Sequence, residues 1–141
     1  MMHNGQEIGN EKMLEFFERD PIAWGEPHWV GELFTDLFGL LEVNTAIWHG
    51  DAGGQMVEIA TSAPDAVYAF EREMDEDGVF AVFNFSAEAR TVSFGDYETG
   101  EGFADFYSRA PASLSAGGTI SLEPWSHVLL VRGAMPEASG R

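Results

Sequence analysis

The residue pattern changes character near Gly50, and this change restricts the folds that the chain can adopt. Before it, residues 29–42 repeat apolar side chains at helical spacing. After it, short alternating segments are separated by Gly, Asp, Ser and Pro, which is typical of strands joined by turns. The predicted strands are 55–61, 66–72, 79–86, 89–94, 102–108, 119–122 and 126–132. About seven short antiparallel strands at this spacing predict a β-sandwich or barrel that follows one helix.

Two further segments refine this prediction. Residues 79–85 are apolar at every position except Asn84, which is expected of a strand with both faces covered. The sequence Asp-Glu-Asp-Gly at 75–78 predicts a tight turn between two strands. Residues 1–28 are mostly irregular, with one short helix expected at 12–18 before the breakers Asp20-Pro21.

The charge excludes several kinds of partner. The chain of 141 residues carries 24 acidic and 7 basic side chains, which gives a formal charge of −17. Nucleic acids and anionic membranes need clustered Lys and Arg, so we expect neither as a partner. A neutral ligand such as a sugar is unaffected by this charge. No apolar run approaches the about 20 residues of a membrane span, and the first residues do not form a signal peptide. The compartment stays open, because residue 1 need not be the natural start.

No motif of a familiar active site or metal site stands in the sequence. The chain has no cysteine, and its 4 histidines form no metal-binding pair. It lacks the Gly-x-Ser-x-Gly motif of serine hydrolases and the phosphate-binding loop. Asp75, Glu76 and Asp77 lie in a predicted turn, where solvation explains them. We therefore expect no metal and no cofactor.

Aromatic side chains are the remaining candidates for ligand contact. The faces of Trp and Tyr rings stack on sugar rings, while their polar ends reach solvent. The side chains considered for sugar stacking are Trp48, Tyr68, Tyr97 and Tyr107. Packing in the core or between domains is the alternative for each of them, and it is the more common use of such residues.

Several segments in the first third of the chain together resemble one enzyme family. Residues 4–9, Asn-Gly-Gln-Glu-Ile-Gly, resemble the segment after the eighth barrel strand of α-amylase-type enzymes, glycoside hydrolase family 13. Residues 16–24 resemble the loop before the last barrel helix, and residues 29–42 correspond to that helix. Residues 44–48 resemble its Asn-Pro-Ala-Leu ending, with Thr45 in place of proline.

The strand region resembles the C-terminal domain of the same family. The matching segments are 79–86, which ends in Asn-Phe-Ser, 103–107, with Phe103 at the usual Tyr, and 120–130. The resemblance implies that residues 1–48 are the remnant of the last unit of a (β/α)8 barrel. Residues 49–136 would be a Greek-key β-sandwich of about seven or eight strands, and 137–141 a tail.

The resemblance also implies what this chain does and does not do. The family cleaves or transfers α-glucosidic bonds of starch-like glucans with an Asp, a Glu and a second Asp. Those residues precede the eighth strand in motifs that this chain lacks, so we expect no catalytic residue and no hydrolysis by the chain itself. Only Gln6 and Glu7 map near the substrate side, and only when a full barrel is present.

The expected partner is therefore the catalytic barrel of the parent enzyme, in cis. The apolar face of helix 29–42 must also be covered, either by the sandwich or by a second copy in a homodimer. A carbohydrate-binding module that uses the exposed aromatics is the alternative function, and an acidic interaction domain unrelated to starch is a third.

Overall fold

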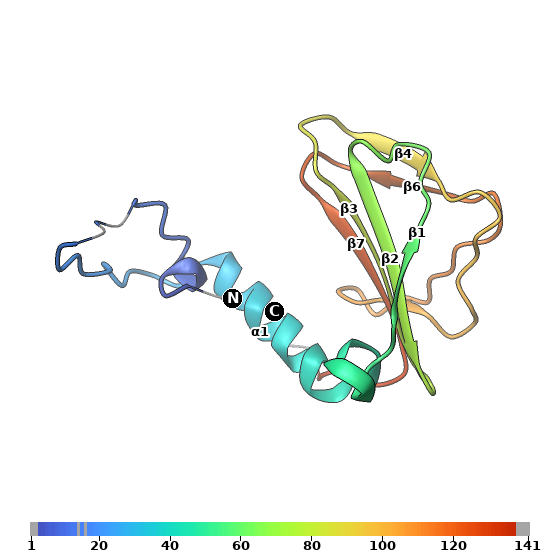
Figure 1. Cartoon of the computed structure of the whole chain (residues 1–141), viewed down its shortest axis with the longest axis horizontal. Coiled ribbons are helices and arrows are strands. Elements are labelled where there is room, and N and C mark those ends of the chain that lie inside the picture. Colours follow the sequence, from blue (N-terminus) through green and yellow to red (C-terminus); the bar gives the residue numbers. More distant parts are fainter. Residues whose placement is uncertain (1–2, 14, 16, 138–141) are drawn as a thin grey trace. The chain divides into compact units, whose positions relative to one another are not determined.

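The computed structural model describes residues 3–13, 15 and 17–137. The chain divides into two compact units, one within Met1–Leu40 and Pro136–Arg141 and the other at Leu41–Met135. Figure 1 shows the helix α1 and the strands of the sheets. No helix among the described residues is long and apolar enough to cross a membrane.

The first unit contains a short 3-10 helix, η1 (Gln6–Ile8), and most of α1 (Trp29–Val43). The prediction of a helix from residue 29 is confirmed. The short helix expected at 12–18 is wrong for the described residues of that segment, which are not helical; residues 14 and 16 lie outside the described residues. Side chains satisfy the backbone there instead, because Asp20 Oδ2 accepts from Glu15 N–H at 3.1 Å and Asn10 Oδ1 accepts from Lys12 N–H at 3.2 Å.

The second unit is an antiparallel β-sandwich, so the predicted fold class is confirmed. Its larger sheet has the strand order β1-β2-β3-β7-β5, and β4 pairs with β6 in the smaller sheet. Because β7 pairs with β3 while β4 and β6 lie in the other sheet, the connections cross between sheets in the Greek-key manner. The strands are β1 (Met56–Ile59), β2 (Val67–Met74), β3 (Asp77–Asn84), β4 (Arg90–Ser93), β5 (Ala104–Asp105), β6 (Thr119–Leu122) and β7 (His127–Arg132).

Apolar side chains fill the space between the two sheets. The centre is Phe80 of β3, which is fully buried, stacks on Tyr97 at 5.5 Å and meets Phe94 edge to face at 5.7 Å. Val92 of β4 and Leu122 of β6 close the core from the smaller sheet. The other core residues are Ile59, Val67, Ala69, Val82, Phe103, Leu114 and Leu130. Alternate residues of β2, β3 and β7 thus face inward, and the rest form the outer face of the larger sheet.

Each predicted strand exists, although one is much shorter than expected. The segment 102–108 forms only the two residues of β5. Its pattern is interrupted because Asp105 Oδ1 accepts from the N–H and the hydroxyl of Ser108, both at 2.8 Å, and Arg109 has a left-handed φ of 61°. The chain therefore turns where alternation alone predicts continued extension.

Candidate functional site

Gln6 and Glu7 take part in local turns of the first unit. Glu7 Oε2 accepts from Gly5 N–H at 2.8 Å, and Gln6 Oε1 accepts from His3 N–H at 2.8 Å. An open groove of about 400 Å³ lies beside them. Its lining includes Gln6, Asn10, Glu11, His28, Trp29 and Phe34. The substrate role of Gln6 and Glu7 stays a prediction that depends on a complete barrel.

Trp48 follows the short helix η2 (Thr45–Ile47), which comes directly after α1. Its indole Nε1–H donates to the carbonyl of Leu41 at 3.0 Å, and 39% of the residue remains exposed. The indole N–H thus satisfies a carbonyl of the last helical turn, which otherwise has no partner within the helix. The geometry gives Trp48 a capping role.

Asn44 and Thr45 attach the chain after α1 to the sandwich. The Asn44 side chain is fully buried; its Nδ2 donates to the carbonyls of Arg132 and Ala134, both at 3.0 Å, and its Oδ1 accepts from Ala46 N–H at 3.2 Å. Thr45 donates from its N–H and its hydroxyl to Asp77 Oδ2, both at 2.7 Å. The bonds of Asn44 satisfy both polar atoms of its side chain, as is usual for a polar group buried inside a protein.

Asp77, the first residue of β3, completes this anchor. Its Oδ1 accepts from Ala134 N–H at 2.8 Å. Partial burial raises the pKa of Asp77, but the hydrogen bonds from Ala134 and Thr45 and the charge of Arg132 outweigh it, so the pKa lies below its ordinary value of 3.8. Gly133 is required beside it, because φ is 82° and a Cβ there would clash with Asp77 Oδ1.

Arg72 of β2 holds the other side of η2. Its guanidinium donates to the carbonyls of Gly54 at 2.8 Å, Ile47 at 3.3 Å and Trp48 at 2.7 Å. Asp77 binds the N–H end of η2 and Arg72 binds its carbonyl end. Because η2 contacts both β2 and β3, this segment covers one end of the outer face of the larger sheet.

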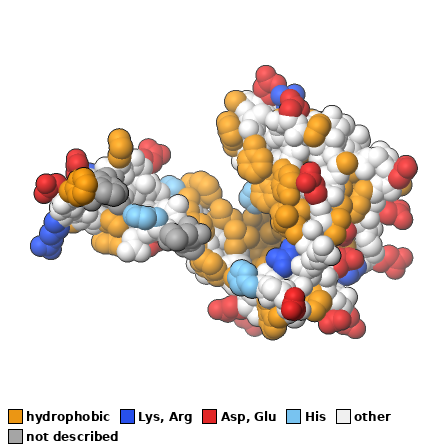
Figure 2. Space-filling view, in the orientation of Figure 1, with side chains coloured by type: hydrophobic (Ala, Val, Ile, Leu, Met, Phe, Trp, Pro, Cys, Tyr) orange, Lys and Arg blue, Asp and Glu red, His pale blue; other side chains and the backbone are white. Residues whose placement is uncertain are grey.

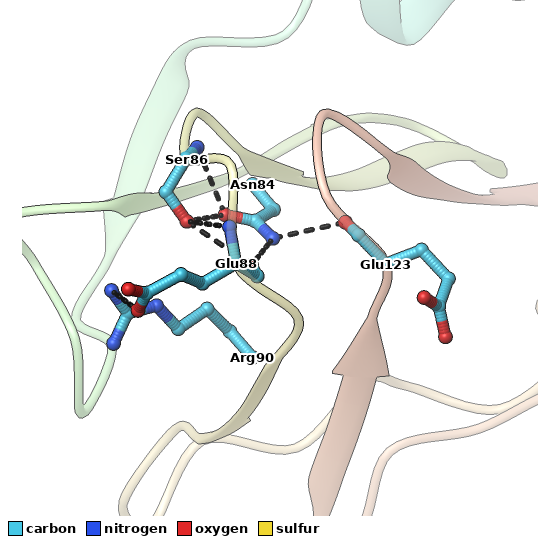
Figure 3. Close-up of polar contacts among 5 residues, drawn as sticks. All are labelled: Asn84, Ser86, Glu88, Arg90 and Glu123. Atoms are coloured by element: carbon cyan, nitrogen blue, oxygen red, sulfur yellow. Dashed lines mark hydrogen bonds and ion pairs between the residues drawn. The ribbon is translucent and has the colours of Figure 1, made fainter.

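Asn84 forms a second polar cluster at the opposite end of β3 (Figure 3). Its Nδ2 donates to the carbonyls of Glu88 at 2.7 Å and Glu123 at 2.9 Å. Its Oδ1 accepts from the N–H of Ser86 at 3.1 Å and from the Ser86 hydroxyl at 2.7 Å. One buried amide therefore joins the turn after β3 to the loop before β7. It does so mainly by binding backbone groups of these two segments.

Tyr97 is a core residue, unlike the other tyrosines considered for sugar stacking. Its ring packs on Phe80 inside the sandwich, and its buried hydroxyl lies near the Glu71 carboxyl without a hydrogen bond of regular geometry. Burial, followed by the neighbouring Glu71, raises the pKa of the Tyr97 hydroxyl. Burial likewise raises the pKa of Glu71. The ring is partly buried and packs against the core, so its contact with Phe80 is structural.

Tyr68 and Tyr107 belong to a row of rings on the outer face of the larger sheet, which we call the aromatic strip. It consists of Tyr68, Phe70, Phe83, Phe85, Tyr107 and His127. Phe83 lies at its centre, stacked on Phe70 at 6.2 Å, on Phe85 at 5.8 Å and on His127 at 5.9 Å. His127 Nε2 and the Tyr107 hydroxyl are 2.6 Å apart. Burial lowers the pKa of His127.

The sequence reasoning missed most of these positions. Asn84 had a visible signal, because it is the one polar residue in an apolar strand. Phe83, Phe85 and His127 had none, since only the strand register places them beside Tyr107. No group of three or more His, Asp or Glu side chains that could hold a metal ion occurs in the part of the chain that the structure describes.

Comparison with known proteins identifies the fold. No protein-family model matches the chain, and no curated protein sequence matches it. A noncanonic maltogenic alpha-amylase, AmyB from Thermotoga neapolitana, matches with a TM-score of 0.75 at 18% identity, over 94% of this chain and 32% of that chain. AmyP in complex with maltose matches with a TM-score of 0.53 at 24% identity, over 79% of this chain and 21% of that chain.

These matches show that the chain has the fold of one part of a larger amylase. It spans 32% of the length of AmyB and 21% of that of AmyP. The resemblance drawn from the sequence motifs is confirmed at the level of the fold, and both matched structures are amylases.

Proposed function

We propose that this chain is the C-terminal part of a longer α-glucan-acting glycosidase of the α-amylase type, and that its own role is structural. The observation that carries the proposal is the match over 94% of this chain but only 32% of AmyB. Residues 1–48 correspond to the last unit of the barrel, residues 49–136 to the sandwich and residues 137–141 to a tail. The three carboxylates of catalysis belong to the missing part.

The anchor around Asn44 supports a structural role. Asn44, Thr45 and Asp77 bind the chain directly after α1 to one end of the β3–β7 pair, where β3 begins and β7 ends, through buried or half-buried hydrogen bonds. The first residues of this unit are thus part of its folded structure, whereas a separately acting module is usually joined by a flexible linker. The domain thus serves to complete and stabilise a catalytic part that comes before it.

The test compares this chain with the longer polypeptide encoded by its source reading frame. Each is incubated with maltoheptaose, and released glucose and maltose are measured against a buffer blank. We expect sugar release from the longer polypeptide and none from the chain alone. Release by the chain alone would refute the non-catalytic role, and an inactive longer polypeptide would refute the glycosidase assignment.

The second candidate function is a carbohydrate-binding module, and the aromatic strip is the observation that favours it. Tyr68 and Tyr107 are the sugar-stacking candidates that lie in the strip, while Trp48 and Tyr97 have structural contacts. Calorimetric titration of the chain with β-cyclodextrin separates the two functions. Saturable heat that disappears in Tyr107→Ala supports binding, and no heat supports the structural role.

A further inference from the structure

The turn between β6 and β7 holds a tryptophan in a backbone conformation that favours glycine. Ser126 N–H donates to the carbonyl of Glu123 at 3.2 Å, which closes a β-turn with Pro124 at its second position and Trp125 at its third. Trp125 has a left-handed φ of 56°. A positive φ at the third position after a proline is typical of a type II turn, where Gly or Asn is the usual residue. A bulky aromatic residue in this conformation strains the backbone.

The Trp125 side chain does not offset this strain by packing. It is 68% exposed, which makes it the most exposed of the four tryptophans. In Trp48, by contrast, the indole N–H donates to the carbonyl of Leu41. A strained residue whose side chain lies in solvent is a candidate for a functional role, because strain of this kind persists at sites that use it.

Hydrogen bonds fix the turn that carries Trp125. The N–H of Trp125 donates to the carbonyl of Ser86 at 3.1 Å, and the N–H of Asn84 donates to the carbonyl of Ser126 at 2.9 Å. The buried amide of Asn84 also donates to the carbonyl of Glu123 at 2.9 Å (Figure 3). The exposed ring therefore stands on a preorganised backbone, which loses little conformational entropy when a ligand covers the ring.

Exposed polar side chains come from the two segments that meet at this turn. Glu123 is the first residue of the turn and is exposed. The segment that begins at Ser86 carries Glu88 and Arg90, whose carboxylate and guanidinium form an ion pair at 2.8 Å. Carboxylates accept hydrogen bonds from hydroxyl groups and guanidinium groups donate to them. An apolar platform with a few polar groups is the usual composition of a small-ligand site.

The charge of the chain restricts the class of ligand. A formal charge of −17 repels anions, and Figure 2 shows acidic side chains spread over the visible side of the sandwich with few basic ones among them. A neutral sugar is not repelled, and its ring has an apolar face that stacks on an indole while its hydroxyls reach polar groups. A small organic cation is usually held in a cage of several rings, whereas the turn offers one.

We propose that Trp125 is the stacking platform of a surface site for a glucan, with Glu88, Arg90 and Glu123 as the polar groups beside it. The choice of an α-linked glucan rests on the proposed function, whereas the platform itself does not. The site adds sugar binding to the structural role of the domain. It also differs from the aromatic strip, where the Tyr107 hydroxyl lies 2.6 Å from His127 Nε2.

Calorimetric titration with β-cyclodextrin tests the platform. Trp24→Gly is the matched control for Trp125→Gly, because it removes the same ring from a position that is 62% exposed against 68%. We expect saturable heat in the parent and in Trp24→Gly, and at least about tenfold weaker binding in Trp125→Gly, since a tryptophan anchor dominates the contacts it makes. Absence of heat in the parent, or equal affinity in Trp125→Gly, would overturn the proposal. Binding lost in Tyr107→Ala but kept in Trp125→Gly would assign the sugar to the aromatic strip and would also overturn it.

Thermal unfolding of Trp125→Gly separates ligand contact from a packing role. Glycine adopts a positive φ without strain, so the unfolding midpoint of this variant should not fall below that of the parent. Weaker sugar binding together with an unchanged or higher midpoint supports the platform. A midpoint several degrees lower would show that the ring packs within the domain, and would contradict the proposal.

Further ligands test the class of partner. Heat from an oligolysine peptide but none from β-cyclodextrin would assign Trp125 to a cationic partner, and heat from cellohexaose alone would refute the α-linked glucan; both results overturn the proposal. The longer polypeptide should show the same Trp125-dependent binding. Its absence there, with binding by the chain alone, would show that the preceding part covers the ring and would overturn the site.

Failure of the sugar site and failure of the proposed function give different results. A longer polypeptide that releases sugar from maltoheptaose but shows no Trp125-dependent binding refutes the sugar site alone. Trp125-dependent binding of β-cyclodextrin by a longer polypeptide that releases no sugar refutes the glycosidase assignment alone.

Discussion

At the scale of single residues, Asn84 shows why a polar side chain is placed in an apolar strand. Its amide meets four hydrogen-bonding groups of Ser86, Glu88 and Glu123 while it is itself buried. Glu88 and Glu123 contribute only backbone carbonyls to Asn84, and the Glu88 carboxylate instead pairs with the Arg90 guanidinium at 2.8 Å. Asn84 therefore links, by hydrogen bonds, two loops that are far apart in the sequence. An apolar residue of the same size would leave the backbone groups that it binds buried without partners.

Replacement of Asn84 should therefore destabilise the domain strongly. We expect Asn84→Ala to lower the free energy of unfolding by about 3 kcal/mol, because it leaves buried backbone groups unsatisfied and opens a small cavity. Ser121→Ala is the matched control, since it removes a surface hydrogen bond to Thr91 and should cost less than about 0.5 kcal/mol. Urea unfolding followed by tryptophan fluorescence measures both. Equal stabilities for the two variants would show that Asn84 does not hold the loops.

At the scale of elements, η2 is attached to the sandwich through side chains of two strands. Asp77 of β3 accepts from its N–H end, and Arg72 of β2 donates to its carbonyl end. The pairing suits the helix dipole, since the negative group lies at the amino end and the positive group at the carboxyl end. Both contacts of η2 with the sandwich are therefore polar.

Asp77 makes the attachment of η2 sensitive to acid. Its pKa in the folded protein lies below the ordinary 3.8, so its stabilising effect is fully present above that value and is lost as the pH falls through the lower folded pKa. We expect Asp77→Asn to cost about 2 kcal/mol at pH 7 and the difference from the parent to shrink below pH 3.8. Asp96→Asn, in an exposed turn, is the control. Urea unfolding at several pH values tests this, and a difference that stays constant in acid would contradict it.

At the scale of the whole molecule, charge opposes the compact state. A formal charge of −17 on 141 residues creates self-repulsion, which salt screens over about 10 Å at 0.1 M and about 3 Å at 1 M. We expect the thermal unfolding midpoint to rise between these salt concentrations. A variant that combines Glu58→Gln, Glu98→Gln and Glu101→Gln should show a smaller rise, because it begins with less repulsion. If the unfolding midpoint of the parent did not change with salt, repulsion between the acidic side chains would not destabilise the folded state.

Most of the fold follows from local pattern. The period of the apolar residues predicted α1, and alternation with Gly and Asp turns predicted every strand from β1 to β7. These features depend on near neighbours in sequence, because the helical period and the strand alternation decide which side chains share a face. The shortened β5 is the exception, since Asp105 binds Ser108 and diverts the chain.

The candidate site follows from tertiary structure. Tyr107 and His127 meet only because β5 lies beside β7, and Phe83 joins them only through the β3–β7 register. Tyr97 enters the core because the loop after β4 carries its ring onto Phe80. The sequence by itself determined the class of fold and the acidic, cysteine-free chemistry, since these depend on composition and local period. Only the tertiary structure decided which aromatics gather on the outer face, because that depends on which strands pair and in which register.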